Sequence, residues 1–300
     1  MLSFLPGVLR GALGMFGYAI NTVFWSTPLI LLAILKLLIP IAAVRKLLSR
    51  ILNWCASSWI SVNSLIQKLF LKLSLEIEVD AELSTKARYL VIANHQSWVD
   101  ILILQRVLNG RIPFLKFFLK KELLYVPLLG IAWWALDFPF MQRYSKSFIK
   151  KNPHLAGKDI ETTRKACEKF KQLPVSIMNF VEGTRFTPEK HQRQKSPFKH
   201  LLKPKAGGIA FVLSSMGEQL HSILDITISY DTKRPPTMWE FVCGKLSQCK
   251  VHVRAIEIDD DLTRDYAGNS EHRVAFQRRI NQIWADKDER LDQLAESNTK

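Results

Sequence analysis

The amino-acid sequence predicts an α/β fold in which helices cover a largely parallel sheet. Short apolar runs alternate along the chain with stretches of helical periodicity, the order typical of such layered folds. A long uncharged stretch precedes this alternation and predicts a helical membrane anchor. The chain has 300 residues, 48% of them hydrophobic, which fits one large domain with an appendage. We therefore expect an anchor and an amphipathic helix over residues 1–74 and one large domain over residues 75–300.

The uncharged stretch spans residues 11–35, between Arg10 and Lys36. It is long enough to cross a bilayer as a helix, for which about 20 mainly apolar residues suffice. A cleavable signal peptide fits less well, because the stretch is too long and its amino-terminal flank is weakly basic. A second apolar segment over residues 37–44 is interrupted by Pro40, so a helical hairpin remains open, but the single span is the favoured prediction. More basic residues follow the apolar stretch than precede it, which predicts that the rest of the chain lies in the cytosol.

Amphipathic periodicity begins directly after this segment. From residue 45 to 72, apolar side chains recur at spacings of three and four, which fits both a packed core helix and a helix lying on a membrane surface. The apolar runs that we interpret as strands are residues 75–79, 89–93, 134–141, 175–181, 223–230 and 249–258. The stretches that we interpret as helices are residues 98–108, 160–172, 206–215 and 273–290. This order predicts strands of a largely parallel sheet joined by helices.

The formal net charge of +15 is distributed unevenly. Residues 1–75 carry seven basic side chains and no acidic one, and residues 185–205 carry seven basic side chains against one acidic. Beyond residue 257, acidic side chains outnumber basic ones. This distribution suits an anionic membrane surface or an anionic substrate. Nucleic acid is not expected as a partner, because no helix-turn-helix, zinc-finger or aromatic-basic RNA signature accompanies the charge.

The cysteines and histidines do not form a metal-binding pattern. Cys55, Cys167, Cys243 and Cys249 match neither a zinc spacing nor a small disulfide framework, so we expect structural thiols in a reducing compartment. No His-Glu-x-x-His sequence is present. We therefore expect no metal and no cofactor.

A histidine is followed five residues later by an aspartate at two places, His95 with Asp100 and His154 with Asp159. The first pair lies between the apolar run at residues 89–93 and a helix, where α/β proteins place their sites. With His95 in the turn and Asp100 early in the helix, the aspartate can orient one ring nitrogen and leave the other as a general base. His154 lies in a polar loop, and Asp159 is there interpreted as a helix start. We therefore predict catalysis by His95 and a structural role for His154.

The segment Phe-Val-Glu-Gly-Thr-Arg at residues 180–185 ends another apolar run. Gly183 allows the backbone to approach a ligand closely, and the planar fork of Arg185 can bind a phosphate. The alternative is a buried structural pair between the arginine and the glutamate of this segment. Arg143 and Lys205, the latter just before a helix start, also suggest a phosphate. Together these residues predict an anionic substrate.

Three ordered segments resemble the motifs of PlsC-like glycerolipid acyltransferases. They are the Asn-His-x-x-x-x-Asp block at residues 94–100, the block at residues 120–130 that leads to Arg143, and the block at residues 180–185. The resemblance covers about residues 20–290 and is greatest to bacterial inner-membrane members of that family. It implies a glycerolipid acyltransferase fold with residues 75–300 as the catalytic domain. The chain departs from the family where a Val-Pro pair is usual, since it has Leu-Asp-Ile-Thr at residues 224–227.

The resemblance implies a role for each motif residue. His95 is expected to be the general base and Asp100 its orienting partner. Lys120 is expected near the phosphate or the oxyanion, and the acceptor is expected to contact Arg143, Glu182 and Arg185. The full set expected to bind substrate is Asn94, Lys120, Arg143, Glu182, Gly183, Thr184, Arg185 and Lys205. The departure at residues 224–227 leaves the preference for an acceptor open.

The reaction expected from this resemblance is transfer of a fatty acyl group to the free hydroxyl of lysophosphatidic acid, giving phosphatidic acid in phospholipid synthesis. The donor is acyl-CoA or acyl carrier protein, used directly without an acyl-enzyme. Ser97 lacks a Gly-x-Ser-x-Gly context and is interpreted as a helix cap. The alternatives are another lysophospholipid or lipid-linked acceptor, or a non-catalytic protein that binds membrane lipid. The expected location is the bacterial inner membrane, with the catalytic domain facing the cytosol.

Overall fold

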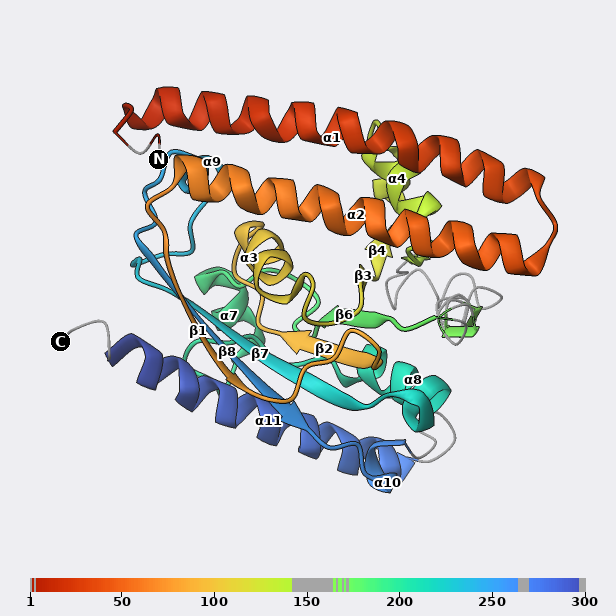
Figure 1. Ribbon diagram of the computed structural model, residues 1–300. Helices are drawn as coiled ribbons and strands as arrows, with labels where there is room; N and C mark the ends of the chain where they lie inside the picture. The colour runs from red at the N-terminus through yellow and green to blue at the C-terminus, as the bar shows by residue number, and fades with distance from the viewer. Residues whose placement is uncertain are drawn as a thin grey trace.

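The computed structural model describes residues 2, 4–141, 164–165, 167–168, 170, 173–263 and 270–296. Over these residues a six-stranded sheet lies at the centre, with helices on both faces (Figure 1). In chain order, its strands are β1 (Ser74–Asp80), β2 (Tyr89–Ala93), β3 (Leu115–Phe117), β6 (Ser176–Phe180), β7 (Ser222–Tyr230) and β8 (Gln248–Ile256). Their spatial order is β1-β8-β7-β2-β6-β3. Every neighbouring pair is parallel except β7 and β8, so the largely parallel sheet is confirmed.

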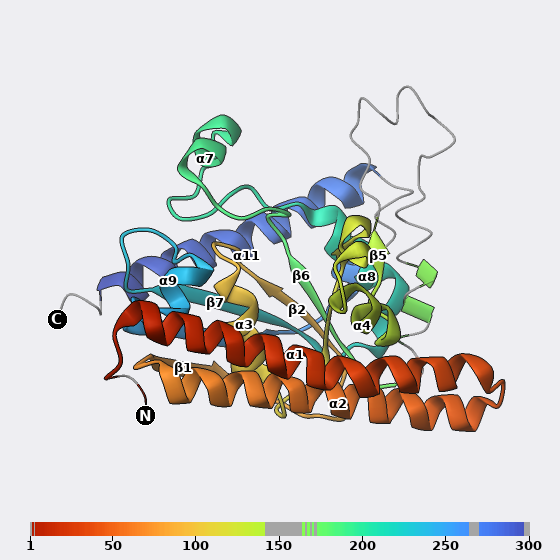
Figure 2. The same cartoon turned by 90° about the horizontal axis from the view of Figure 1, so that it is seen from above.

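Long helices cover the two faces of this sheet. One face carries α3 (Val99–Leu108), α2 (Ala42–Phe70) and, farthest from the sheet, α1 (Gly7–Leu38). The other face carries α8 (Ala206–Met216), α10 (Asp260–Thr263) and α11 (Ser270–Glu296). The shorter elements are β4 (Leu119–Lys120), η1 (Lys121–Tyr125), α4 (Leu129–Ala135), β5 (Phe140–Met141), α7 (Pro188–Gln194), η3 (Gly217–Gln219) and α9 (Met238–Val242). Seen from above, α1 and α2 lie side by side and α7 projects from the body (Figure 2).

Strand β2 has an apolar sequence throughout because it is covered on both faces. Tyr89, Val91 and Ala93 pack in the core formed with α2 and α3, whereas Leu90 and Ile92 pack in the core formed with α8 and α11. All five side chains are fully buried. A strand that is buried on both faces contains a continuous apolar run instead of an alternating one. This burial fixes the position at which the following loop leaves the sheet.

Helices α1 and α2 form a hairpin whose turn contains Pro40 (Figure 1). The side-chain amide of Asn21 in α1 donates to the Trp59 carbonyl at 3.0 Å and to the Asn63 amide oxygen at 2.9 Å, both in α2. The buried face of α2 includes Leu52 and packs in the same core as α3. Residues 45–70 therefore belong to a helix that packs one face against the sheet domain, and its contact with a membrane surface stays a prediction.

Both ends of α1 contact the domain that contains the sheet. Near its start, the Arg10 guanidinium donates to the Cys243 carbonyl at 2.5 Å. Near its end, the Lys36 ammonium lies 2.6 Å from the Asp137 carboxylate. A Cβ atom at Gly11 would lie 2.6 Å from Cys243 Sγ, so glycine permits the close approach of α1 at this point. The hairpin is therefore packed against the sheet domain along its length.

The strand predicted over residues 134–141 is wrong for most of its length. Helix α4 continues to Ala135, and only Phe140–Met141 is extended. Between them Asp137 has a left-handed backbone with φ of 57°, which ends the helix. A short apolar and aromatic run lacks the periodicity that separates helix from strand. The helix predicted over residues 160–172 lies mostly outside the described residues, although 164, 165, 167, 168 and 170 are helical.

A buried ion pair attaches α11 to the sheet. The Lys287 ammonium lies 2.6 Å from Asp225 Oδ1 and also donates to the Ile226 carbonyl at 2.6 Å. The Arg254 guanidinium lies 2.9 Å from Asp225 Oδ2. Removing one partner of such a pair costs about 3–5 kcal/mol, because a charge is left uncompensated. Asp225, where the chain departs from the family pattern, therefore serves the packing of α11.

Candidate active site

The carboxyl ends of β2, β6 and β7 meet at one edge of the sheet. Ala93 at the end of β2 is in register with Phe180 at the end of β6 and with Ile226 in β7. The loops that follow β2 and β6 therefore leave the sheet side by side, and they carry His95 and Glu182. Ligand sites of open α/β sheets lie at this edge. The two motif blocks that are far apart in the sequence thus meet here.

His95 and Asp100 form a hydrogen-bonded pair. His95 Nδ1 lies 2.9 Å from Asp100 Oδ2. His95 is in the turn before α3 and Asp100 is in its first turn, so a spacing of five residues brings them together. The Asp100 side chain is 1% exposed and that of His95 is 14% exposed. An Nδ1–H that donates to the carboxylate leaves the lone pair on Nε2, which is then the ring nitrogen available as a base.

Asp100 also accepts hydrogen bonds from three further donors. The backbone amides of Gln96 and Ser97 donate to Oδ2 at 2.6 and 2.9 Å, and the Tyr230 hydroxyl donates to Oδ1 at 2.5 Å. Burial, together with the charge of Asp100, raises the pKa of Tyr230, so its phenol remains a donor. Donors of this kind compensate the carboxylate for its lost hydration. The aspartate is therefore held in one orientation by β7, by the turn and by His95.

Phe180 fixes the plane of the imidazole. The rings of His95 and Phe180 stack with centroids 3.9 Å apart and an interplanar angle of 13°. Phe117 at the end of β3 lies behind Phe180, with ring centroids 6.1 Å apart. The imidazole is thus held by Asp100 at its edge and by Phe180 on its face.

Glu182 joins the two loops that surround His95. Its Oε1 accepts from the His95 backbone amide at 2.8 Å, and its Oε2 accepts from the Leu202 backbone amide at 3.0 Å. The residue is fully buried, and this burial raises the pKa of its carboxyl to about 8. The structural pair considered between Glu182 and Arg185 is not present, since both carboxyl oxygens bond to backbone amides. This arrangement favours positioning of His95 over contact with substrate.

Asn94 and Ser97 have structural hydrogen bonds. The buried Asn94 amide donates to the Ile228 carbonyl and accepts from the Ile228 amide, both at 2.9 Å. The Ser97 hydroxyl donates to the Pro236 carbonyl at 2.5 Å and accepts from the Val99 amide at the start of α3 at 3.1 Å. Asn94 therefore ties the site loop to β7, which favours a positioning role over the predicted substrate contact. Ser97 stabilises the first turn of α3, as expected for a residue at a helix start.

The loop that follows β6 presents Arg185 at the surface. Gly183 has φ of 68°, a conformation that favours glycine, and its amide closes a turn on the Phe180 carbonyl at 2.8 Å. The exposed Arg185 guanidinium lies over the Trp98 ring, 4.9 Å from its centroid. Stacking uses the face of the guanidinium and leaves its planar N–H groups directed outward. Arg185 is therefore placed near His95 in a form that can bind an anion.

Lys190 in α7 holds this loop in place. Its ammonium donates to the Thr184 hydroxyl at 2.9 Å and to the Arg185 carbonyl at 2.8 Å. The predicted site residue Thr184 is therefore engaged by Lys190. These two bonds fix the backbone from which Arg185 extends.

The remaining predicted residues occupy different places. Lys120 is exposed at the end of β4, and Lys205 is exposed at the start of α8, where its amide donates to the Val181 carbonyl at 2.8 Å. Their contact with substrate stays a prediction. Arg143 and the second pair, His154 with Asp159, lie outside the described residues.

One group of side chains in the described part of the chain has metal-ligand geometry. The ligand atoms of Glu78, Asp80 and His252 lie within 4.8 Å of one another, on β1 and β8. His252 Nε2 lies 2.7 Å from Asp80, and Arg290 forms an ion pair with Glu78. These pairs account for the cluster, which shares no residue with the His95 site. The absence of a metal in the function stays a prediction.

Three residues of the site were not predicted from the sequence. They are Tyr230, which holds Asp100, Phe180, which stacks on His95, and Lys190, which holds the Arg185 loop. Tyr230 and Phe180 are the last residues of their strands. Their location at the carboxyl edge of a parallel sheet was a signal that could have identified them.

Comparison with known proteins identifies relatives for the central part of the chain. A family model described as Acyltransferase matches residues 74–230. The chain is 27% identical over 188 residues to the human 1-acyl-sn-glycerol-3-phosphate acyltransferase delta, covering 58% of this chain and 47% of that protein. It is 28% identical over 201 residues to the Arabidopsis thaliana 1-acyl-sn-glycerol-3-phosphate acyltransferase 3, covering 61% of this chain and 50% of that protein. The chain thus spans about half the length of these curated relatives.

A solved structure has a similar fold. It is the crystal structure of the 1-acyl-sn-glycerophosphate acyltransferase PlsC from Thermotoga maritima, with a TM-score of 0.52 and 15% sequence identity. The similarity covers 94% of this chain and 98% of that one. It therefore extends to the two-helix hairpin as well as the sheet.

The raised pKa of Glu182 predicts a pH dependence of stability. Below about pH 8 the folded protein keeps the proton of the Glu182 carboxyl. The unfolded chain loses this proton above pH 4.5, the ordinary pKa of a glutamate. The contribution of Glu182 to the free energy of unfolding should therefore decrease as the pH rises from 4.5 to about 8. The slope should reach at most about 1.4 kcal/mol per pH unit. Glu182→Gln, which cannot titrate, should lack this contribution.

Thermal unfolding of the full chain in detergent at pH 5, 6, 7 and 8 measures this effect. The melting temperature of the wild type relative to that of Glu182→Gln should fall steadily across the series. Two parallel curves would show that Glu182 does not keep its proton on folding.

Proposed function

The chain belongs to the acyltransferase family, and from this we propose that it transfers a fatty acyl group from a thioester to the free hydroxyl of lysophosphatidic acid, giving phosphatidic acid. The main support is the His95–Asp100 pair, with Nδ1 and Oδ2 2.9 Å apart, beside the outward guanidinium of Arg185. Such a pair supplies a base for a hydroxyl proton, and the guanidinium suits a phosphate. The names of the two curated relatives support the same acceptor.

In the proposed mechanism, His95 Nε2 accepts the proton of the acceptor hydroxyl. The hydroxyl oxygen attacks the thioester carbonyl, and the tetrahedral intermediate collapses with loss of the thiol of coenzyme A or acyl carrier protein. The imidazolium returns its proton to the departing sulfur. Asp100, held by Tyr230 and two backbone amides, stabilises the imidazolium charge while it exists. The acyl group passes directly from donor to acceptor, and Ser97 takes no part because its proton is given to the Pro236 carbonyl.

The acceptor phosphate is proposed to bind at the Arg185 loop. Arg185 offers two parallel N–H groups to the phosphate oxygens, and Trp98 supports the guanidinium from one face. Lys190 positions the loop through its two hydrogen bonds. We propose the exposed Lys120 as a further contact of the phosphate or the oxyanion, and Arg143 and the exposed Lys205 as further contacts of the phosphate.

We further propose that the hairpin inserts into one leaflet of the bacterial inner membrane and that the chain does not cross it. Helix α1 is long and apolar enough to span a membrane. Its two ends, however, are bonded to Cys243 and Asp137 of the sheet domain. Its exposed apolar residues are Val8, Leu9, Leu13, Met15, Phe16, Ile20, Val23, Phe24, Leu31, Ile34, Leu35, Leu37 and Leu38. The two ends of a helix that spans the bilayer are separated by its full thickness, about 30 Å. One of the two contacts with the sheet domain would then lie on the far side of the membrane.

Replacement of His95 by alanine tests the proposed reaction. With acyl-CoA or acyl carrier protein as donor and lysophosphatidic acid as acceptor, the wild type should form phosphatidic acid. His95→Ala should lower turnover by about 100-fold or more, the usual contribution of a general base. Product is measured with purified full-length protein, and a melting curve checks the fold.

The matched control is His154→Ala, in the second pair with the same spacing. It should retain nearly full turnover. Equal losses in both variants would refute the assignment of the base. Activity on another lysophospholipid or a lipid-linked acceptor, with none on lysophosphatidic acid, would replace the proposed acceptor, and inactivity with every acceptor would favour a non-catalytic lipid-binding protein.

Arg185→Lys tests the phosphate contact. The ammonium keeps the charge but cannot form two parallel hydrogen bonds, so the KM for lysophosphatidic acid should rise about tenfold. The KM for the donor should change little. Arg193→Lys on α7, also an exposed arginine, is the control and should leave both constants unchanged. Full activity of Arg185→Lys at low acceptor concentration would show that the contact is absent.

Cysteine labelling tests the membrane arrangement. The native cysteines Cys55, Cys167, Cys243 and Cys249 are buried and free, so a probe reports on introduced cysteines. In intact cells, both Ser3→Cys and Ser297→Cys should stay unlabelled until the membrane is opened. Labelling of Ser3→Cys alone would show the single span, and labelling of Ser297→Cys would refute the cytosolic placement.

A further inference from the structure

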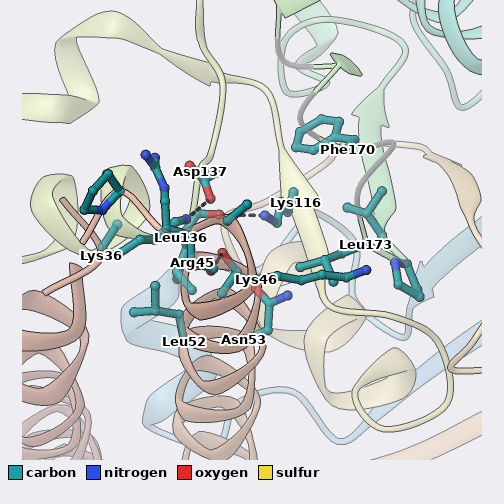
Figure 3. A pocket seen from close by; sticks show the side chains of 16 residues that line it. Lys36, Arg45, Lys46, Leu52, Asn53, Lys116, Leu136, Asp137, Phe170 and Leu173 are labelled. Atoms are coloured by element: carbon teal, nitrogen blue, oxygen red, sulfur yellow. Dashed lines mark hydrogen bonds and ion pairs between the residues drawn. The ribbon is translucent and has the colours of Figure 1, made fainter. Parts of the chain in front are cut away.

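A cavity of about 340 Å³ lies beneath the turn of the α1–α2 hairpin (Figure 3). Its wall combines the end of α1, the first turns of α2, strand β3, the segment after α4 and residues 173–175. A second cavity of about 270 Å³ adjoins it and shares Lys36, Arg45 and Asp137. Segments far apart in the sequence thus form one recess at the tip of the hairpin.

Basic side chains dominate the charge of this recess. Lys36, Arg45, Lys46 and Lys116 line the first cavity, and Asp137 is the acidic residue among its lining residues. The four basic groups therefore exceed the acidic group by three charges. In Figure 3 the side chains of Lys36 and Lys116 approach the cavity from the two sides of the segment at Leu136 and Asp137. The recess is built to attract an anion.

Two of these basic groups are fixed by contacts with the wall. The Lys36 ammonium lies 2.6 Å from Asp137, and the Lys116 ammonium donates to the Leu136 carbonyl at 2.7 Å. Lys116 is 8% exposed, so its charge lies in the protein interior. Asp137 adopts a left-handed backbone conformation, which is unusual for a residue with a side chain. These contacts hold the recess in shape.

The other two, Arg45 and Lys46, are exposed at the start of α2. Among the residues that the structure describes, neither side chain has an acidic partner. The start of α2 also lacks a side-chain cap and has no acidic residue in its first turn. Basic charges near a helix start oppose the helix dipole, and an anion there removes this cost. The fold thus brings four basic groups together at a point where Asp137, paired with Lys36, is the acidic residue of the described lining.

The position of the recess identifies the source of the anion. The neighbouring residues Leu37, Leu38 and Ile41 are large apolar side chains exposed by 59%, 74% and 58%. They continue the exposed apolar face of α1, so in the membrane arrangement proposed above the tip of the hairpin lies in the membrane surface, with the recess at the level of the lipid headgroups. Headgroup phosphates are the anions present at that level.

We propose that this recess binds the phosphate of an anionic membrane phospholipid and thereby fixes the hairpin tip at headgroup depth. The site differs from the proposed acceptor site. Val175, just before β6, lines the recess, and Phe180 at the other end of β6 stacks on His95. Because β6 has five residues, Val175 at the recess and Phe180 at the acceptor site lie about 17 Å apart. The bound lipid is therefore a structural ligand and is not consumed.

Binding of a soluble anionic lipid tests this proposal. The probe is dihexanoyl-phosphatidylglycerol below its micelle concentration, titrated calorimetrically into full-length protein in neutral detergent. Arg45→Gln with Lys46→Gln should weaken binding at least tenfold. The control, Arg50→Gln with Lys68→Gln, removes the same charge from the same helix outside the lining and should change binding less than twofold. The swap Arg45→Lys with Lys46→Arg keeps the charge of the recess. The Kd of this variant for the lipid should stay within threefold of the wild-type Kd.

Two further titrations identify the ligand. Dihexanoyl-phosphatidylcholine, which has no net charge, should bind at least tenfold more weakly than the phosphatidylglycerol. Inorganic phosphate should compete only at much higher concentration. Equal weakening in the two glutamine variants would show diffuse attraction and overturn the proposal, as would preferential binding of inorganic phosphate. Acyl transfer between soluble short-chain substrates should be the same in both variants, so failure of this site and failure of the proposed reaction can be distinguished.

Discussion

The buried carboxylate of Asp100 is the constraint on which the rest of the site depends. A charge at this depth is stable only with a full set of donors, and these come from two parts of the fold: the turn after β2, which includes the imidazole of His95, and the end of β7. The turn is in place because β2 is buried on both faces. Tyr230 is in place because β7 is in register with β2. The orientation of one side chain thus follows from the packing of the whole sheet.

The sequence was sufficient for most of the fold, because apolar periodicity records burial. It predicted β2 to the residue and α3 to within one residue. It failed at residues 134–141, a short apolar and aromatic run without the periodicity that separates helix from strand. The roles of Phe180 and Tyr230 in the site were not predicted, because they depend on the register between strands that are distant in sequence. The functions of Asn94 and Glu182 also required the structure, since a motif does not reveal whether a polar side chain faces a ligand or a backbone amide.

The interior on the opposite face of the sheet contains a second set of charges. Lys287 is fully buried, and its ammonium contacts Asp225 and the Ile226 carbonyl. Ile226 is the residue of β7 that is in register with Ala93, the last residue before the site turn. The electrostatic influence of Lys287 extends to Glu182, whose pKa it lowers against the larger effect of burial. The C-terminal helix α11 therefore supports the site from behind, although it has no residue at the surface of the site.

The stacking of Phe180 on His95 has a consequence for the placement of the two substrates. The imidazole is held on its face by Phe180 and at Nδ1 by Asp100, so in the proposed reaction the same nitrogen, Nε2, both receives the proton and returns it. In the proposed reaction, the nucleophilic oxygen and the departing sulfur must each come within reach of that nitrogen. The immobility of the ring therefore requires the acceptor hydroxyl and the thioester to bind at the same edge of the imidazole.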